Sequence, residues 1–157
     1  MAKKILVIDD NKYHCEFITA AAELFSWNCV ITLNVSAFFD NLAPDTAVIL
    51  LDLMMPEMDG IELLTLLAQR GCRAQIILMS GVGGQVLTAT DQFAQSLGLS
   101  VAGYLRKPFR LAELESIVTE TLQTTPVITS ISRSSHASND QASPPPEPHS
   151  LGQSAQA

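Results

Sequence analysis

Short apolar runs alternate with longer segments of helical periodicity through the first 123 residues of the chain. An uninterrupted apolar run of this kind is typical of a strand that is buried on both faces of a parallel sheet. The run at 47–51 is the clearest, because it ends abruptly on the single carboxylate of Asp52. The pattern predicts strands over residues 5–8, 28–33, 47–51, 75–79 and 101–105.

The segments between these strands carry apolar residues at helical spacing, and capping residues mark their ends. Asn11 and either Asn34 or Ser36 are predicted N-caps, Gly71 is a predicted C-cap, and Gly98 ends a helix. The predicted helices run over residues 12–25, 34–42, 61–70, 85–97 and 111–122. In the first helix, the predicted apolar face consists of Phe17, Ile18, Ala21, Leu24 and Phe25.

Five strands that alternate with five helices predict an α/β fold. Because crossovers are right-handed, few topologies remain, and we predict a flavodoxin-like doubly wound five-stranded parallel sheet of order 2-1-3-4-5 with helices on both faces. From Thr124 onward Ser, Thr, Gln, Asn, Ala and Pro dominate and the periodicity disappears. The sequence therefore predicts one domain over 1–123 and a disordered low-complexity tail over 124–157.

The charge balance narrows the classes of function. A net charge of −7 argues against direct nucleic-acid binding through a basic surface. The apolar run at 5–8 is too short for a signal peptide, and no stretch approaches the ~18 apolar residues of a membrane helix. Three dispersed cysteines, Cys15, Cys29 and Cys72, fit a reducing compartment, so we expect a cytoplasmic protein that does not bind membranes.

Polar side chains follow four of the predicted strands. They are Asp9 with Asp10, then Asp52, Ser80 and Lys107. Because the carboxyl ends of parallel strands share one edge of a sheet, and the order 2-1-3-4-5 makes these strands neighbours, we expect the side chains to converge.

This set of side chains suits phosphoryl chemistry. Clustered carboxylates repel one another, and a hard cation with oxygen ligands, Mg²⁺, removes that repulsion. Lys107 supplies a positive charge for phosphoryl oxygens, Ser80 supplies a hydroxyl donor, and an aspartate such as Asp52 is an established nucleophile for acyl phosphates.

Four motifs in this order and spacing extend the argument over roughly residues 3–123. They are I-L-V-I-D-D, V-I-L-L-D-L-M-M-P-E-M-D-G, I-I-L-M-S-G and Y-L-R-K-P-F. Together they resemble the receiver domain of the two-component response regulator family.

The resemblance implies a role for each matching residue. Asp52 would accept a phosphoryl group from a histidine kinase or a histidine phosphotransfer protein. Asp10 and Asp52 would ligate Mg²⁺, with Asp9 helping through water and Met54 contributing its backbone carbonyl.

The resemblance also implies a switch. Ser80 would bond a phosphoryl oxygen, Lys107 would pair with the phosphoryl group, and Tyr104 would turn inward on activation. The Lys107–Pro108 bond is expected to be cis. The downstream protein would bind the face built from helix 4, strand 5 and helix 5.

Two departures from the family pattern stand out. Gly81 occupies a position where the family usually has alanine, and Ser80 and Lys107 are separated by 27 positions, more than in a typical receiver. The helix 4 region is similar in length and pattern to receivers fused to EAL-type cyclic-di-GMP phosphodiesterase domains. We predict a single-domain regulator, so that enzymatic output is not carried over.

Two other readings remain open. The first is a receiver-like binding module that works without phosphorylation. The second is an aspartate-nucleophile phosphohydrolase, which would need a further acid where this chain has Met54. His14 is predicted to be a surface histidine and not a phosphorylated one.

Overall fold

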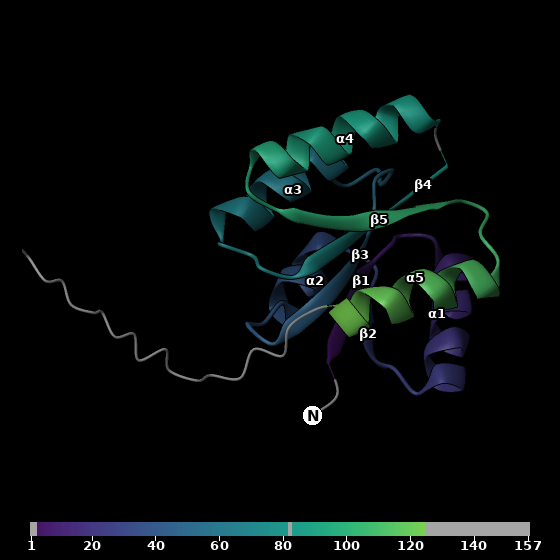
Figure 1. Cartoon of the computed structure of the whole chain (residues 1–157). Helices are drawn as coiled ribbons and strands as arrows, with labels where there is room; N and C mark the ends of the chain where they lie inside the picture. Colours follow the sequence, from purple (N-terminus) through teal and green to yellow (C-terminus); the bar gives the residue numbers. More distant parts are fainter. Residues whose placement is uncertain (1–2, 82, 125–157) are drawn as a thin grey trace, which may run out of the picture. The chain divides into compact units, whose positions relative to one another are not determined.

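The computed structural model describes residues 3–81 and 83–124, which form a five-stranded parallel sheet with helices on both faces (Figure 1). The strand order is β2-β1-β3-β4-β5, so the predicted fold class and topology are confirmed. The elements are β1 (Lys4–Ile8), α1 (Lys12–Phe25), β2 (Asn28–Thr32), α2 (Val35–Asn41), β3 (Thr46–Asp52), α3 (Gly60–Gln69), β4 (Gln75–Ser80), α4 (Gly84–Ser96), β5 (Ser100–Arg106) and α5 (Leu111–Thr124). The predicted tail lies outside the described residues, apart from Thr124, which ends α5.

Each central strand sends alternate residues into two separate cores. Ile5 on β1 packs toward α1 and α5, where it meets Ile18. Its neighbour Leu6 packs toward α2, α3 and α4, where it meets Phe38. All four residues are fully buried, which explains why the strand shows an unbroken apolar run instead of an alternating pattern.

The structure confirms the predicted N-caps of α1 and α2 and corrects the predicted C-cap of α3. The side chains of Asn11 and Asn34 accept backbone N–H bonds at the starts of α1 and α2, so Asn34 is the cap and Ser36 is not. The prediction for Gly71 needs correction, because Arg70 is the C-cap of α3. Gly71 follows it with φ 67°, a left-handed conformation that glycine adopts without strain.

The predicted apolar face of α1 is partly wrong. Ile18 and Ala21 are buried, together with Cys15, but Leu24 is 64% exposed and Phe17 is 38% exposed. The buried stripe passes through residues 15, 18, 21 and 22, and the two exposed residues lie on its flank. An apolar residue on that flank is three or four positions from a buried residue, as helical periodicity requires, but its side chain does not reach the sheet.

Candidate functional site

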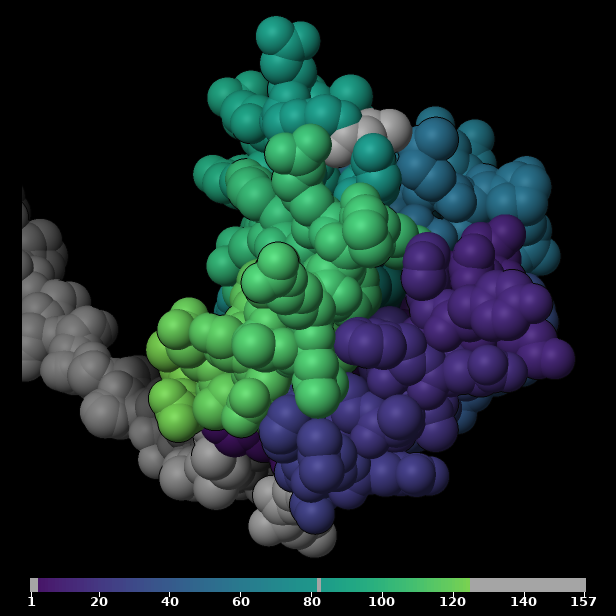
Figure 2. Space-filling model, turned by 90° about the vertical axis from the view of Figure 1, so that its right-hand side faces the viewer, coloured from purple at the N-terminus to yellow at the C-terminus, as the bar shows by residue number. Residues whose placement is uncertain are grey.

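The register of β1 against β3 brings two buried carboxylates together. Ile8 pairs with Leu51 across the sheet, so the next residues along each strand direction, Asp9 and Asp52, lie side by side at the carboxyl edge. Asp9 is fully buried and Asp52 is 2% exposed. Figure 2 shows this side of the molecule, where the start of α1, the segment after β3 and the β5–α5 connection meet.

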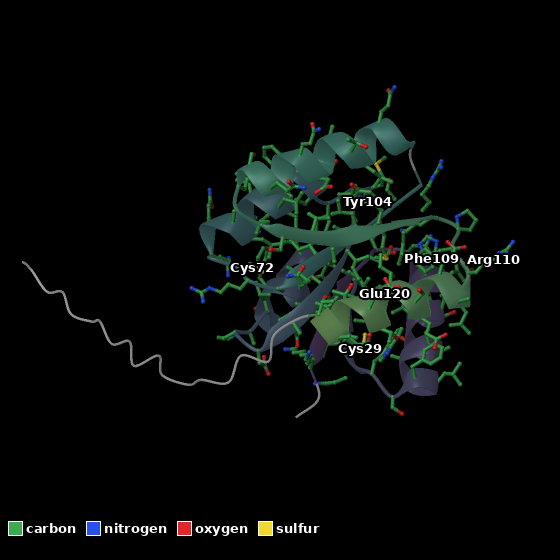
Figure 3. The ribbon with its side chains drawn as sticks, in the orientation of Figure 1. Cys29, Cys72, Tyr104, Phe109, Arg110 and Glu120 are labelled. Carbon is green, nitrogen blue, oxygen red and sulfur yellow. The ribbon has the colours of Figure 1, made fainter. Side chains whose placement is uncertain are left out.

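Lys107 bridges the two carboxylates. Its Nζ lies 2.9 Å from Oδ2 of Asp9 and 3.2 Å from Oδ2 of Asp52. The backbone N–H of Lys107 donates to the carbonyl of Ser80 at 2.9 Å, which fixes the lysine beside the end of β4. The Lys107–Pro108 bond is cis, as predicted. The chain then turns through Phe109 and into α5, as Figure 3 shows.

Burial destabilises the ionised form of Asp52. The pKa of this carboxyl is raised from 3.8 to about 6, chiefly because burial removes water and also because the charge of Asp9 lies close by. The Met54 N–H, which donates to Oδ1 of Asp52 at 3.1 Å, and the Lys107 ammonium act in the opposite direction. Asp52 is therefore a buried anion whose negative charge the surrounding groups only partly offset.

Three carboxylates can share a cation here. Oxygen atoms of Asp9, Asp10 and Asp52 lie within 4.8 Å of one another, and Asp10 is exposed to solvent. Only one ammonium, that of Lys107, contacts this set of three acids in the described residues 3–81 and 83–124. An all-oxygen donor set with excess negative charge fits a hard divalent cation such as Mg²⁺.

Tyr104 lies outside this cluster. It is 39% exposed on β5, and its hydroxyl donates to Oδ2 of Asp91 on α4 at 2.6 Å. Figure 3 places the residue between β5 and α4. The side chain of Ser80, by contrast, is fully buried at the end of β4.

His14 is the site residue that the sequence reasoning missed. Its side chain is 33% exposed, but Nδ1 is buried and lies 3.3 Å from Oδ2 of Asp9. The sequence feature that could have placed His14 near the aspartates is the N-cap Asn11. Its side chain accepts a hydrogen bond from the backbone N–H of His14 at 3.1 Å. That cap ties the first turn of α1 to the loop that carries Asp9 and Asp10.

The cysteines take no part in the site chemistry. All three are free. Burial raises the pKa of Cys15 to about 11 and that of Cys29 to about 12, so these thiols stay protonated at neutral pH. Cys15 instead donates through Sγ to the carbonyl of Asp9 at 3.1 Å, a contact that packs α1 against β1.

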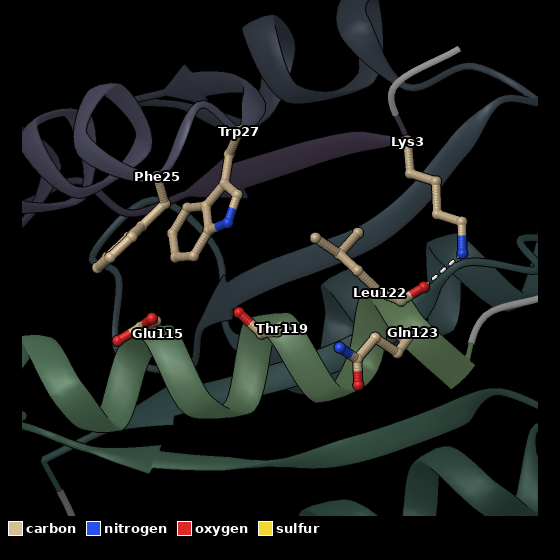
Figure 4. Close-up of a pocket in the computed structure, with 7 residues that line it drawn as sticks. All are labelled: Lys3, Phe25, Trp27, Glu115, Thr119, Leu122 and Gln123. Carbon is tan, nitrogen blue, oxygen red and sulfur yellow. Dashed lines mark hydrogen bonds between the residues drawn. The ribbon is translucent and has the colours of Figure 1, made fainter.

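A separate cavity of about 590 Å³ opens at the amino ends of β1 and β2. Phe25 lines it from the end of α1 and Trp27 from the connection to β2, with ring centroids 5.2 Å apart, and Glu115 lines it from α5 (Figure 4). Lys3 closes one side through a hydrogen bond to the carbonyl of Leu122. Because Asp52 ends β3 at the opposite edge of the sheet, this cavity is distinct from the aspartate cluster.

No helix within residues 3–81 and 83–124 is long and apolar enough to cross a membrane.

Comparison with known families and proteins agrees with the geometry. The family model described as the response regulator receiver domain matches residues 5–119. The chain is 33% identical over 123 residues to the regulatory protein AtoC of Escherichia coli (strain K12), an alignment that covers 76% of this chain and 25% of AtoC. It is 30% identical over 118 residues to the response regulator MprA of Mycobacterium bovis (strain BCG / Pasteur 1173P2), covering 73% of this chain and 48% of MprA. The chain thus spans a quarter to a half of these relatives.

Solved structures show the same fold. A response regulator from Colwellia psychrerythraea superposes with a TM-score of 0.69 at 30% identity, over 78% of this chain and 98% of that protein. The BeF3-activated DrrB receiver domain superposes with a TM-score of 0.64 at 22% identity, over 78% and 99% of the two chains.

Proposed function

Because the chain belongs to the response regulator receiver domain family of two-component signalling, we propose that Asp52 accepts a phosphoryl group from a histidine kinase or a histidine phosphotransfer protein. A carboxylate oxygen of Asp52 attacks phosphorus, a P–O bond forms, and the P–N bond of phosphohistidine breaks. The leaving imidazole keeps the electron pair of that bond and takes up a proton. The observation that carries the proposal is the Lys107 ammonium, which bridges Asp9 and the phosphoacceptor carboxylate.

Asp9, Asp10 and Asp52 are the residues that would hold Mg²⁺. The family resemblance adds the backbone carbonyl of Met54 to this set. A bound cation would supply positive charge for the carboxylates and for the phosphoryl oxygens. The backbone N–H of Asn11 donates to Oδ1 of Asp9 at 2.9 Å and so fixes the orientation of this carboxylate.

Lys107 and Ser80 stabilise the phosphorylated state. Lys107 exchanges its contact with Asp52 for a phosphoryl oxygen, and the Ser80 hydroxyl donates to another phosphoryl oxygen. A phosphoryl group has room beside Ser80, because a Cβ built on the next residue, Gly81, would meet no atom within 4 Å. Both residues are therefore proposed to act on the phosphoryl group, and Ser80 also to report its presence.

The output is a phosphorylation-dependent protein–protein interaction through the face of α4, β5 and α5. Tyr104 is the proposed switch on this face, because its exposed ring lies between β5 and α4. The chain would act in the cytoplasm, without direct contact with nucleic acid or membranes. Its mechanism is a population shift in which phosphorylation favours one arrangement of that face.

A small phosphodonor tests the chemistry. Incubated with Mg²⁺ and acetyl phosphate, the full chain gains the mass of one phosphoryl group in intact-mass spectrometry, and Asp52→Asn gains none. Asp59→Asn is the matched control, because Asp59 caps α3 outside the cluster and its loss leaves the mass gain intact. Equal labelling of Asp52→Asn and the wild type would contradict the proposal.

Beryllofluoride separates this proposal from its alternative, a receiver-like module that binds partners without phosphorylation. With Mg²⁺ and beryllofluoride, the backbone amide signals in the NMR spectrum of the wild type shift around Asp52 and at Tyr104. An unchanged spectrum would support the alternative. Turnover of a generic phosphomonoester would instead indicate a phosphohydrolase.

A further inference from the structure

The first turn of α1 holds His14 in a fixed relation to the aspartates. Oδ1 of Asn11 accepts from the backbone N–H of His14 at 3.1 Å, and Oδ1 of Asp9 accepts from the backbone N–H of Asn11 at 2.9 Å. Cys15, the next residue, is tied to the carbonyl of Asp9 at 3.1 Å. These three contacts connect the first turn of α1 to the acidic loop, so the backbone of His14 is positioned by the same bonds that hold Asp9.

The Nδ1 atom of His14 has an unmet hydrogen-bonding capacity. It is buried, it lies 3.3 Å from Oδ2 of Asp9, and it has no hydrogen-bond partner within residues 3–81 and 83–124. Buried polar atoms in native proteins are nearly always satisfied, either by protein or by ordered water. An unsatisfied ring nitrogen beside a carboxylate that would hold a cation therefore points to a donor that arrives with that cation.

The geometry favours water over direct ligation. The group whose ligand atoms all lie within 4.8 Å of one another contains Asp9, Asp10 and Asp52, and His14 falls outside it. Mg²⁺ keeps several waters when carboxylates bind it, and it is a poor partner for imidazole nitrogen. A water bound to the cation donates hydrogen bonds, and the ring nitrogen of an imidazole that carries no proton accepts one.

We propose that Nδ1 of His14 accepts a hydrogen bond from the hydration shell of the divalent cation held by the three aspartates. His14 is then a positioning residue that raises the affinity of the site for Mg²⁺. The inference rests on the proposed function, because it requires the cation at Asp9, Asp10 and Asp52. It adds a residue of α1 to a site that the sequence predicts only from strand ends.

Calorimetric titration of the full chain with MgCl₂ at pH 8 tests the proposal. His14→Leu binds Mg²⁺ about 10-fold more weakly than the wild type, the lower end of the effect of an outer-shell partner. His14→Asn places an oxygen acceptor near the position of Nδ1 and stays within about 3-fold of the wild type. Equal Mg²⁺ affinity of His14→Leu and the wild type overturns the proposal, as does a His14→Asn variant no better than His14→Leu.

Two controls separate this role from a structural one. Tyr13→Leu alters the adjacent residue, which is 77% exposed, and leaves Mg²⁺ affinity unchanged. In EDTA, the melting temperature of His14→Leu stays equal to or above that of the wild type, because the orphaned nitrogen is gone. A lower melting temperature in EDTA with wild-type Mg²⁺ affinity assigns His14 to packing and overturns the proposal.

Titration with MnCl₂ and NiCl₂ distinguishes direct ligation. If the histidine contacts only water of the hydration shell, His14→Leu lowers the affinities for Mg²⁺ and Mn²⁺ to a similar degree. If Ni²⁺ affinity falls far more than Mg²⁺ affinity, the imidazole is a ligand itself and the proposal is wrong. Failure of the wild type to bind Mg²⁺ would instead contradict the cation site of the proposed function, so the two failures are distinguishable.

Discussion

The hydroxyl of Tyr104 donates a 2.6 Å hydrogen bond to Oδ2 of Asp91, and this bond ties β5 to α4 at the surface. The other oxygen of Asp91 accepts from Nε2 of Gln95, one turn further along α4, at 2.8 Å. Asp91 is thus held on its helix while it holds the tyrosine ring in an outward position. If the phosphorylated protein carries Tyr104 inward, Asp91 opposes that movement.

Loss of Asp91 lowers the pKa of Tyr104. The hydrogen bond to Asp91 is the largest cause of the raised pKa of this phenol, because the bond favours the protonated form. The chain has two tyrosines, so a Tyr13→Phe background leaves Tyr104 as the only reporter. Absorbance titration of the phenolate in Asp91→Ala then gives a lower pKa than in the parent, whereas Gln95→Ala keeps it raised.

The same variant tests the switch. If phosphorylation favours the inward ring, Asp91→Ala binds beryllofluoride about 3- to 10-fold more tightly in the presence of Mg²⁺, because a contact of the resting state is lost. An unchanged phenolate titration would show that the bond to Asp91 is absent in solution. A lower pKa with unchanged beryllofluoride affinity would show that the ring position is not coupled to the site.

The sequence predicts the sheet and the aspartate cluster for a common reason. Unbroken apolar runs require strands buried on both faces, and the parallel order then places the residues after β1 and β3 next to each other. Asp9, Asp52 and Lys107 follow from strand ends alone, without knowledge of any side-chain rotamer.

The remaining features depend on how helices pack, which periodicity does not determine. Leu24 has helical spacing but lies on the flank of α1, and only the contact of α1 with the sheet shows it to be exposed. The ring of His14 reaches Asp9 because of a cap and a rotamer, and Asp91 meets Tyr104 because α4 runs beside β5. Such contacts join elements whose separation is set by the packed cores.

Asp52→Asn stabilises the protein at neutral pH when no divalent cation is present. The folded-state pKa of Asp52 is about 6, above its usual value of 3.8, so between these values the folded state binds more protons than the unfolded state. The contribution of Asp52 to the free energy of unfolding is fully present below pH 3.8 and is lost as the pH rises through about 6. Urea denaturation in EDTA at pH 7 therefore gives the variant an advantage of roughly 1 to 3 kcal/mol over the wild type.

Acid and Mg²⁺ both reduce the stability advantage of Asp52→Asn. At pH 4 the two unfolding free energies converge, because Asp52 is then mostly protonated in the folded wild type. With Mg²⁺ at pH 7 the wild type gains stability through cation binding, and Asp52→Asn gains less. An advantage of the variant that persists unchanged at pH 4 would show that the carboxylate charge is not its cause.

Lys107→Met destabilises the protein and strengthens cation binding. The lysine is the ammonium that contacts both buried carboxylates, and its loss leaves them without that compensation. In EDTA at pH 7 we expect a loss of about 2 to 4 kcal/mol in the free energy of unfolding. Because the ammonium also repels a cation at the same oxygens, Mg²⁺ binds Lys107→Met more tightly, as calorimetry can measure.

Lys12→Met provides the charge-matched control. Lys12 is exposed at the start of α1, so its replacement changes stability by no more than about 0.5 kcal/mol. It removes the same formal charge as Lys107→Met, and comparison of the two separates the local contact from the net charge. Equal effects of both variants on Mg²⁺ affinity would contradict a specific role for Lys107.

Gly60→Ala displaces the segment that carries the phosphoacceptor. A Cβ on Gly60 would lie 2.6 Å from Cδ2 and 3.0 Å from Cα of Leu53, the residue directly after Asp52. Leu53 is only 7% exposed, so the overlap has to move its backbone as well as its side chain. We expect a loss of about 1 to 3 kcal/mol in urea denaturation, accompanied by weaker Mg²⁺ binding.

Gly81→Ala separates steric overlap from the general effect of replacing a glycine. Gly81 lies directly after the buried Ser80, but a Cβ at this position meets nothing within 4 Å. The substitution therefore leaves the unfolding free energy unchanged or raises it slightly, since alanine restricts the unfolded chain. Only the added Cβ at Gly60 would overlap Leu53, the residue after Asp52. A fall in Mg²⁺ affinity in Gly60→Ala but not in Gly81→Ala therefore assigns the effect to the position of the Asp52 carboxylate. Equal stability losses in the two variants would contradict this assignment.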